Sequence, residues 1–173
     1  MHAGMVRAIH AHVRRVQTRK ELDYSHYGAP ISEFDMLRTW FDFTYIPYAG
    51  LRRMGWQLTA EEEKEVFYLW KIVGRMLGIR PDLFRGEDGV EASQETMDAI
   101  HAVDGEINEA ARQLVDALMS GFVVNAKELT GFPEDTLADW TAAHVRIIHG
   151  DEVADACGVD NSVMRPILEM QAP

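Results

Sequence analysis

Apolar residues recur every three or four positions along most of this chain, which is the spacing typical of amphipathic α-helices. A first helix of moderate length is indicated by four residues at this spacing: Val6, Ile9, Val13 and Val16. We find no convincing alternation of apolar and polar residues of the kind that a half-buried strand requires. The pattern therefore predicts an all-α fold, and we expect a single compact domain of about six helices over residues 1–173.

The second predicted helix begins at a capping box. Ser32 is followed three residues later by Asp35, so that each side chain can satisfy a backbone amide at the start of a helix. Pro47 should kink or end this helix, because proline lacks the amide donor and its ring clashes with the preceding turn.

The clearest helix in the sequence should begin at Thr59. Glu62 stands three residues later as the second half of a capping box, and Gly78 sits where a glycine would end the helix. The other helices are expected at about residues 92–119, with Gly105 as a candidate break, at 133–150 with Pro133 as the first helical residue, and at 151–156 before an irregular tail.

The composition is that of an ordinary globular protein, since 47% of the chain is hydrophobic and 26% is charged. No apolar run approaches the roughly 20 residues that a transmembrane helix needs, so we expect no transmembrane segment. Cys157 is the single cysteine, which excludes an intrachain disulfide and suits a reducing, cytoplasmic compartment.

Charge is distributed unevenly along the chain. Residues 1–20 contain five basic residues and no acidic one, whereas the rest contains 12 basic and 28 acidic residues. An acidic body argues against a nucleic-acid partner, because phosphate neutralisation needs a broad basic surface. The basic start fits either a transit peptide or an anion-binding helix face, and we favour the second interpretation.

The segment RAIHAHVRR places a histidine between two arginines, in the order Arg7, His10 and Arg14. At about 100° per residue these three side chains fall within an arc of roughly 60° on one helix face. His12 lies some 200° from His10, so the two histidines cannot chelate one metal from a regular helix. The arrangement suits haem, whose iron takes an axial histidine and whose two propionates can bind arginine.

An ordinary interpretation of the same spacing stays open. A helical histidine beside arginines is usually a surface residue, and the arginines usually pair with carboxylates, of which this chain has 28. On the spacing alone, we favour this ordinary interpretation over a cofactor site.

A second block of sequence changes that balance. The chain resembles the family of the MpaB oxygenase and the rubber oxygenases (latex clearing proteins). The likeness lies in the Arg-x-x-His-x-x-x-Arg helix, in the helix that follows residues 30–32, and in the segment GWQLTAEEEKEVFYLWKIVGRMLGIRP. Within the second block the likeness is carried by Gly55, Leu58, Trp70, Gly74, Gly78 and Pro81. The resemblance is strongest over residues 1–81.

This resemblance implies a specific activity and site. It implies a helical oxygenase that contains haem b, with His10 as the ligand of the iron and with Arg7, His10 and Arg14 as cofactor-binding residues. It assigns catalytic roles to His10 and Arg14. The expected substrates are dioxygen and an apolar, isoprenoid-like small molecule. The alternative is a non-catalytic helical domain that binds a ligand or a partner, or an inactive fragment of such an oxygenase.

The chain also departs from the family pattern. In the family a helical segment that supplies residues above the haem precedes the motif helix, whereas here the motif starts within ten residues of Met1. We therefore expect this chain to lack that segment, and haem ligation is a better supported expectation than catalysis.

Other candidate residues receive ordinary interpretations. A core role is favoured over a pocket for the aromatic stretch formed by Trp40, Phe41, Phe43, Tyr45 and Tyr48. His144 and His149 should lie about 140° apart on one helix, which is poor geometry for joint chelation. No partner is identified for His26 or His101, and no dinucleotide, nucleotide-phosphate, serine-hydrolase or zinc-finger motif is present.

Overall fold

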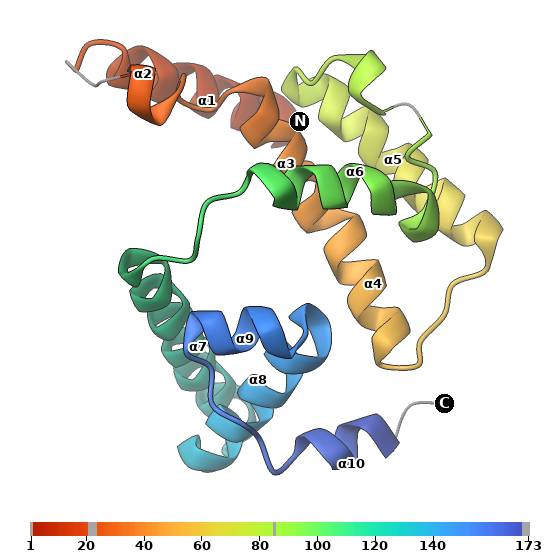
Figure 1. Cartoon of the computed structure of the whole chain (residues 1–173), viewed down its shortest axis with the longest axis vertical. Coiled ribbons are helices and arrows are strands. Elements are labelled where there is room, and N and C mark those ends of the chain that lie inside the picture. Colours follow the sequence, from red (N-terminus) through yellow and green to blue (C-terminus); the bar gives the residue numbers. More distant parts are fainter. Residues whose placement is uncertain (1, 21–23, 85, 171–173) are drawn as a thin grey trace. The chain divides into compact units, whose positions relative to one another are not determined.

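The computed structural model describes residues 2–20, 24–84 and 86–170, and these form helices and connecting loops with no strand (Figure 1). The predicted all-α class is confirmed. The described residues form ten α-helices and one 3₁₀ helix, so the count of about six was too low. The higher number of helices has two causes. Short helices occur in segments that were expected to be irregular, and one long predicted helix is divided in two.

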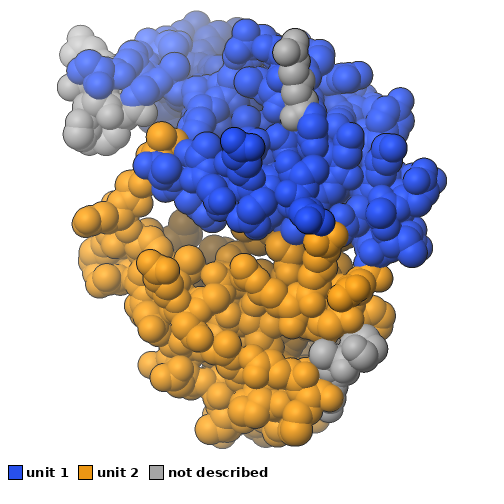
Figure 2. All heavy atoms as spheres, turned by 45° about the vertical axis from the view of Figure 1, so that its right-hand side comes forward, with its two compact units in different colours: residues 1–45, 58–102 blue, residues 46–57, 103–173 orange. Residues whose placement is uncertain are grey.

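The chain divides into two compact units, which Figure 2 shows in different colours. Unit 1 consists of residues 1–45 and 58–102, and unit 2 consists of residues 46–57 and 103–173. Each unit is described by itself below, and the single domain over residues 1–173 stays a prediction.

Unit 1 is built around the packing of two helices onto a third. Its elements are α1 (His2–Gln17), α2 (Tyr24–Tyr27), α3 (Glu33–Phe43), α5 (Ala60–Leu77), the 3₁₀ helix η1 (Pro81–Phe84) and α6 (Val90–Val103). Helices α1 and α3 both pack against α5. Aromatic rings fill the centre, where Trp40 contacts Phe41, Phe67 and Phe84 with ring centroids 5.0–5.9 Å apart.

The two predicted capping boxes are present in this unit. Ser32 accepts a hydrogen bond from the Asp35 amide, and the Asp35 carboxylate accepts one from the Ser32 amide, so α3 begins as expected. Thr59 and Glu62 make the same reciprocal pair at the start of α5, and Gly78 ends that helix with a φ of +110°. Only glycine adopts this left-handed conformation without strain.

Pro47 acts differently from the prediction. Helix α3 ends at Phe43, four residues before Pro47, and α4 (Tyr45–Arg53) begins at Tyr45. Pro47 is the third residue of α4, within the first turn, where the amide that proline lacks has no partner inside the helix. The break therefore precedes the proline.

Unit 2 contains most of α4 and the C-terminal helices. These are α7 (Glu109–Thr130), α8 (Glu134–His149), α9 (Asp151–Cys157) and α10 (Arg165–Met170). Arg146 of α8 is buried and donates to the carboxylates of Asp151 and Asp155, and this ties α8 to α9. The hydrogen bond that Arg146 donates to Asp155 raises the pKa of Arg146 above its ordinary value.

Three boundaries in this part of the chain differ from the predictions. The helix expected over residues 92–119 is two helices, because α6 ends at Val103 and Asn108 opens α7, which continues to Thr130. Pro133 is the residue before α8 rather than its first helical residue. The tail contains α10. Among the described residues, no helix is long and apolar enough to cross a membrane.

Candidate functional site

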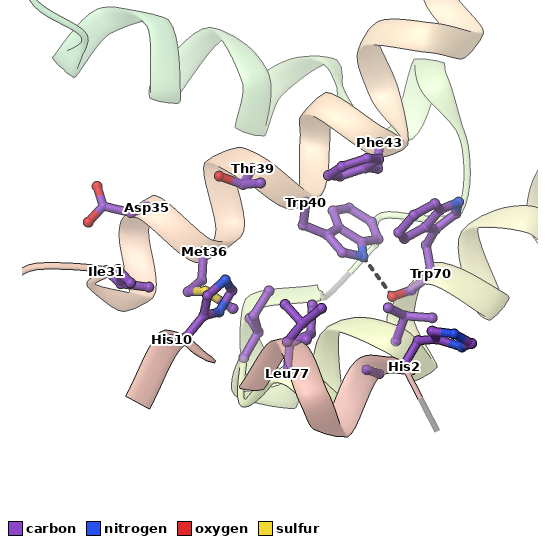
Figure 3. Close-up of a pocket in the computed structure, with 14 residues that line it drawn as sticks. His2, His10, Ile31, Asp35, Met36, Thr39, Trp40, Phe43, Trp70 and Leu77 are labelled. Atoms are coloured by element: carbon purple, nitrogen blue, oxygen red, sulfur yellow. Dashed lines mark hydrogen bonds between the residues drawn. The ribbon is translucent and has the colours of Figure 1, made fainter. Parts of the chain in front are cut away.

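An apolar cavity of about 750 Å³ lies within unit 1, between α1, α3 and α5 (Figure 3). This volume falls in the range of about 300–1,000 Å³ that is typical of small-molecule and cofactor sites. The residues that line it come from these three helices and the segments beside them: His2, Ala3, Val6, His10, Ile31, Asp35, Met36, Thr39, Trp40, Phe43, Trp70, Val73, Leu77 and Ile79.

Each wall of the cavity is one face of a helix. Helix α1 contributes residues at positions i, i+4 and i+8, and α3 contributes residues at i, i+3, i+4 and i+7. On α5 the lining residues Trp70, Val73 and Leu77 follow the same periodicity. The cavity is therefore a space that three amphipathic helices share.

His10 is the residue of this cavity with an unsatisfied polar atom. Its side chain is partly buried, and its Nδ1 is fully buried with no hydrogen-bond partner among the described residues. In Figure 3 the imidazole points from α1 toward the side of the cavity where Met36 of α3 lies, while the Asp35 carboxylate points away from it. Because buried polar atoms are almost always hydrogen-bonded, this nitrogen needs an explanation.

Arg7 does not line the cavity. Its Nη1 donates to the carbonyl of Met76 at 3.3 Å, and its guanidinium lies beside Gly78, at the C-terminal end of α5. Carbonyl groups at a helix C-terminus have no partner within the helix and carry partial negative charge, so a cation is favourable there. Arg7 thus ties α1 to the end of α5.

Arg14 is also directed at a backbone carbonyl. Its Nη1 donates to the carbonyl of Ile31 at 2.9 Å, in the segment directly before α3. The structure therefore places the three motif residues on one helix, as the spacing predicts, but only His10 reaches the cavity. The two arginines connect α1 to the other two walls.

Aromatic residues form the part of the cavity near Trp70. The Trp40 indole is buried and donates from Nε1 to the carbonyl of Trp70 at 2.8 Å. Phe43 stacks on Trp70 with ring centroids 5.1 Å apart and an interplanar angle of 20°. Trp40 and Phe43 of the aromatic stretch thus line the cavity, whereas Phe41 is fully buried in the core.

Sequence reasoning missed several cavity residues. The missed residues with polar groups are His2, Asp35 and Thr39, and the missed apolar ones include Ile31, Met36 and Val73. The only sequence signal for the apolar ones is helical periodicity, which a core position produces equally well.

The other histidines lie elsewhere. His101 is exposed on α6, and the side chain of His26 lies outside the described residues. His144 and His149 line a second apolar cavity, of about 530 Å³, in unit 2. Among the described residues, no group of three or more histidine, cysteine, aspartate or glutamate side chains is arranged to hold a metal ion.

Comparison with known proteins identifies a family for this chain. The family model described as "ER-bound oxygenase mpaB/B'/Rubber oxygenase, catalytic domain" matches residues 2–171. The search of curated proteins and the search of solved structures returned no match.

Proposed function

This chain belongs to the mpaB and rubber oxygenase catalytic-domain family, and from that membership we propose that it is a haem b-dependent oxygenase. We propose that it uses dioxygen to oxidise an apolar, isoprenoid-like small molecule. The observation that carries the proposal is the buried, unpartnered Nδ1 of His10 at the wall of a large apolar cavity.

The residues of the cavity fit a haem in two respects. An iron ligand needs one ring nitrogen that is free of hydrogen bonds within the protein, and Nδ1 of His10 has no hydrogen-bond partner among the described residues. The lining is predominantly apolar, as a flat hydrophobic macrocycle requires, and the cavity volume of about 750 Å³ suits a cofactor.

In this proposal His10 would hold the iron, and the haem would supply the chemistry with dioxygen. The aromatic side chains of Trp40, Phe43 and Trp70 would bind apolar surface and exclude water from it. Arg7 and Arg14 were expected to contact the cofactor. Their hydrogen bonds to backbone carbonyls support instead a role in holding α1, and therefore His10, against α5 and the start of α3.

The test is a titration of the purified chain with hemin, followed by visible absorption. We expect a saturable Soret band near unit stoichiometry for the wild type, and its loss in His10→Ala. His12→Ala is the matched control, because His12 is exposed on the same helix two residues away. Equal hemin binding by wild type and His10→Ala would contradict the assignment of His10.

The alternative is a non-catalytic helical domain that binds a ligand or partner. The same titration separates the two, because a wild-type chain that folds but binds no hemin is not a haem oxygenase as it stands. Family membership by itself does not determine the substrate, since one fold serves different chemistries.

A further inference from the structure

Ile31 has a backbone conformation that its side chain disfavours. Its φ is +52°, and among the described residues it is the only non-glycine residue with a positive φ. A β-branched residue rarely adopts this left-handed region, because its Cβ crowds the following carbonyl oxygen. A specific contact is therefore needed to keep Ile31 in this conformation.

Arg14 makes that contact. Its guanidinium donates to the Ile31 carbonyl at 2.9 Å in a partly buried environment, and hydrogen bonds from a charged donor are among the stronger ones. Directly after Ile31, the capping box of Ser32 and Asp35 begins α3. The turn at Ile31 is thus held on one side by Arg14 and is continuous with α3 on the other.

This turn belongs to the cavity wall that faces His10. Ile31 lines the cavity, and α3 supplies its next wall residues, including Met36. Arg14 lies one helical turn after His10 on α1. The hydrogen bond from Arg14 to Ile31 therefore connects the helix that carries His10 with the turn that leads into α3. Figure 3 labels three of the cavity residues on these segments, His10, Ile31 and Met36.

We propose that Arg14 is a positioning residue that holds Ile31 in its left-handed conformation and thereby sets the spacing of α1 and α3 around His10. Arg14 acts through Ile31 and does not touch the group bound in the cavity. This inference deepens the proposed function, and it rests on that function only where hemin is the probe.

The test is a double-mutant cycle of Arg14→Ala and Ile31→Gly. Glycine adopts a positive φ without strain, so the turn should no longer depend on Arg14 once Ile31 is replaced. The first probe is Nile red, a neutral apolar dye, which reports the cavity without a charge that Arg14 could attract. Arg14→Ala should weaken dye binding by about tenfold in the wild-type background and by less than about threefold in the Ile31→Gly background.

Controls separate this role from charge and from general destabilisation. Arg15→Ala removes the same charge from the neighbouring, exposed position and should leave dye binding unchanged. Arg14→Gln keeps an amide donor without the charge, so it should weaken dye binding less than Arg14→Ala does. It replaces Arg14→Ala in the cycle if Arg14→Ala does not fold. If the wild type does not bind the dye, the same four proteins are compared by their free energies of unfolding in urea. Arg14→Ala should then lower the free energy of unfolding by less in the Ile31→Gly background than in the wild type.

Two results would overturn the proposal. One is that Arg14→Ala weakens dye binding by the same factor in the wild-type and the Ile31→Gly backgrounds. The other is that, in the Ile31→Gly background, Arg14→Ala weakens hemin binding far more than it weakens dye binding. That result would show that Arg14 contacts an anionic ligand directly. A wild type that binds the dye but not hemin contradicts the haem proposal alone, and the dye cycle still tests Arg14.

Discussion

Gly74 shows how closely the side chains around the cavity wall are packed. A Cβ built at this position would lie 2.5 Å from the Phe84 ring and 3.2 Å from the Trp40 ring. Both rings belong to the core of unit 1, and Trp40 also lines the cavity. The absence of a side chain at Gly74 is therefore what lets α3 and η1 approach α5.

We expect Gly74→Ala to destabilise the protein by about 1–3 kcal/mol, because overpacking outweighs the better helix propensity of alanine. Gly121→Ala is the matched control. A Cβ at Gly121, inside α7, would meet no atom within 4 Å, so this variant should gain about 0.5–1 kcal/mol. Urea unfolding of both variants measures the difference, and Gly74→Ala with wild-type stability would contradict this view of the packing.

The residues of the candidate site differ in how far sequence could identify them. His10 stands out because a histidine between two arginines on one face is an unusual pattern, and the family resemblance gave it a role. The targets of Arg7 and Arg14 are backbone carbonyls, which every residue has, so no pattern of side chains could indicate them. The left-handed conformation of Ile31 was equally hidden, since a β-branched residue gives no such signal.

Helix α5 forms one wall of the cavity, and its start depends on a capping box. Thr59 accepts a hydrogen bond from the amide of Glu62, and the Glu62 carboxylate accepts from the Thr59 amide and hydroxyl. These hydrogen bonds lower the pKa of Glu62 below its ordinary value, with the Thr59 amide as the main cause.

The sign of the pH dependence follows from that shift. A carboxyl group whose pKa is lowered by folding stabilises the folded state above its unfolded pKa of about 4.3, and the contribution is lost as the pH falls through the folded pKa. We expect Thr59→Ala to cost about 1 kcal/mol at pH 7 and less at pH 3. Urea unfolding at the two pH values measures this, and Glu62→Gln should remove the pH dependence of the difference. A cost that is the same at both pH values would contradict the role of the ionised Glu62.

At the scale of elements, helices with caps were predictable and breaks without a marker residue were not. The starts of α3 and α5 follow from side chains that satisfy specific amides. The end of α3 has no such marker, since Thr44 alone separates α3 from α4 within a continuous aromatic stretch, and the proline nearby misled the prediction. The residues between α6 and α7 form a loop around Gly105, which the sequence indicated only as a candidate break.

In the part of the chain that the structure describes, an apolar cavity lined by histidine is found in each unit. His10 lies at the cavity of unit 1, and its Nδ1 has no hydrogen-bond partner among the described residues. His144 lies at the cavity of unit 2, and its Nδ1 is 2.8 Å from the carbonyl of Trp140. Metal-bound histidines usually engage their second nitrogen in this way, so geometry alone offers His144 as a rival ligand. The larger cavity and the family motif favour His10.

Hydrogen exchange across the whole chain distinguishes the two cavities. A ligand that binds the folded state stabilises the elements it contacts, so their amides should exchange more slowly when it is bound. With hemin added, we expect slower exchange in peptides from α1, α3 and α5, and this protection should be lost in His10→Ala. His144→Ala serves as the control and should keep it. Protection confined to α7 and α8, or lost only in His144→Ala, would place hemin in the cavity of unit 2 and would leave His10 without the role proposed for it.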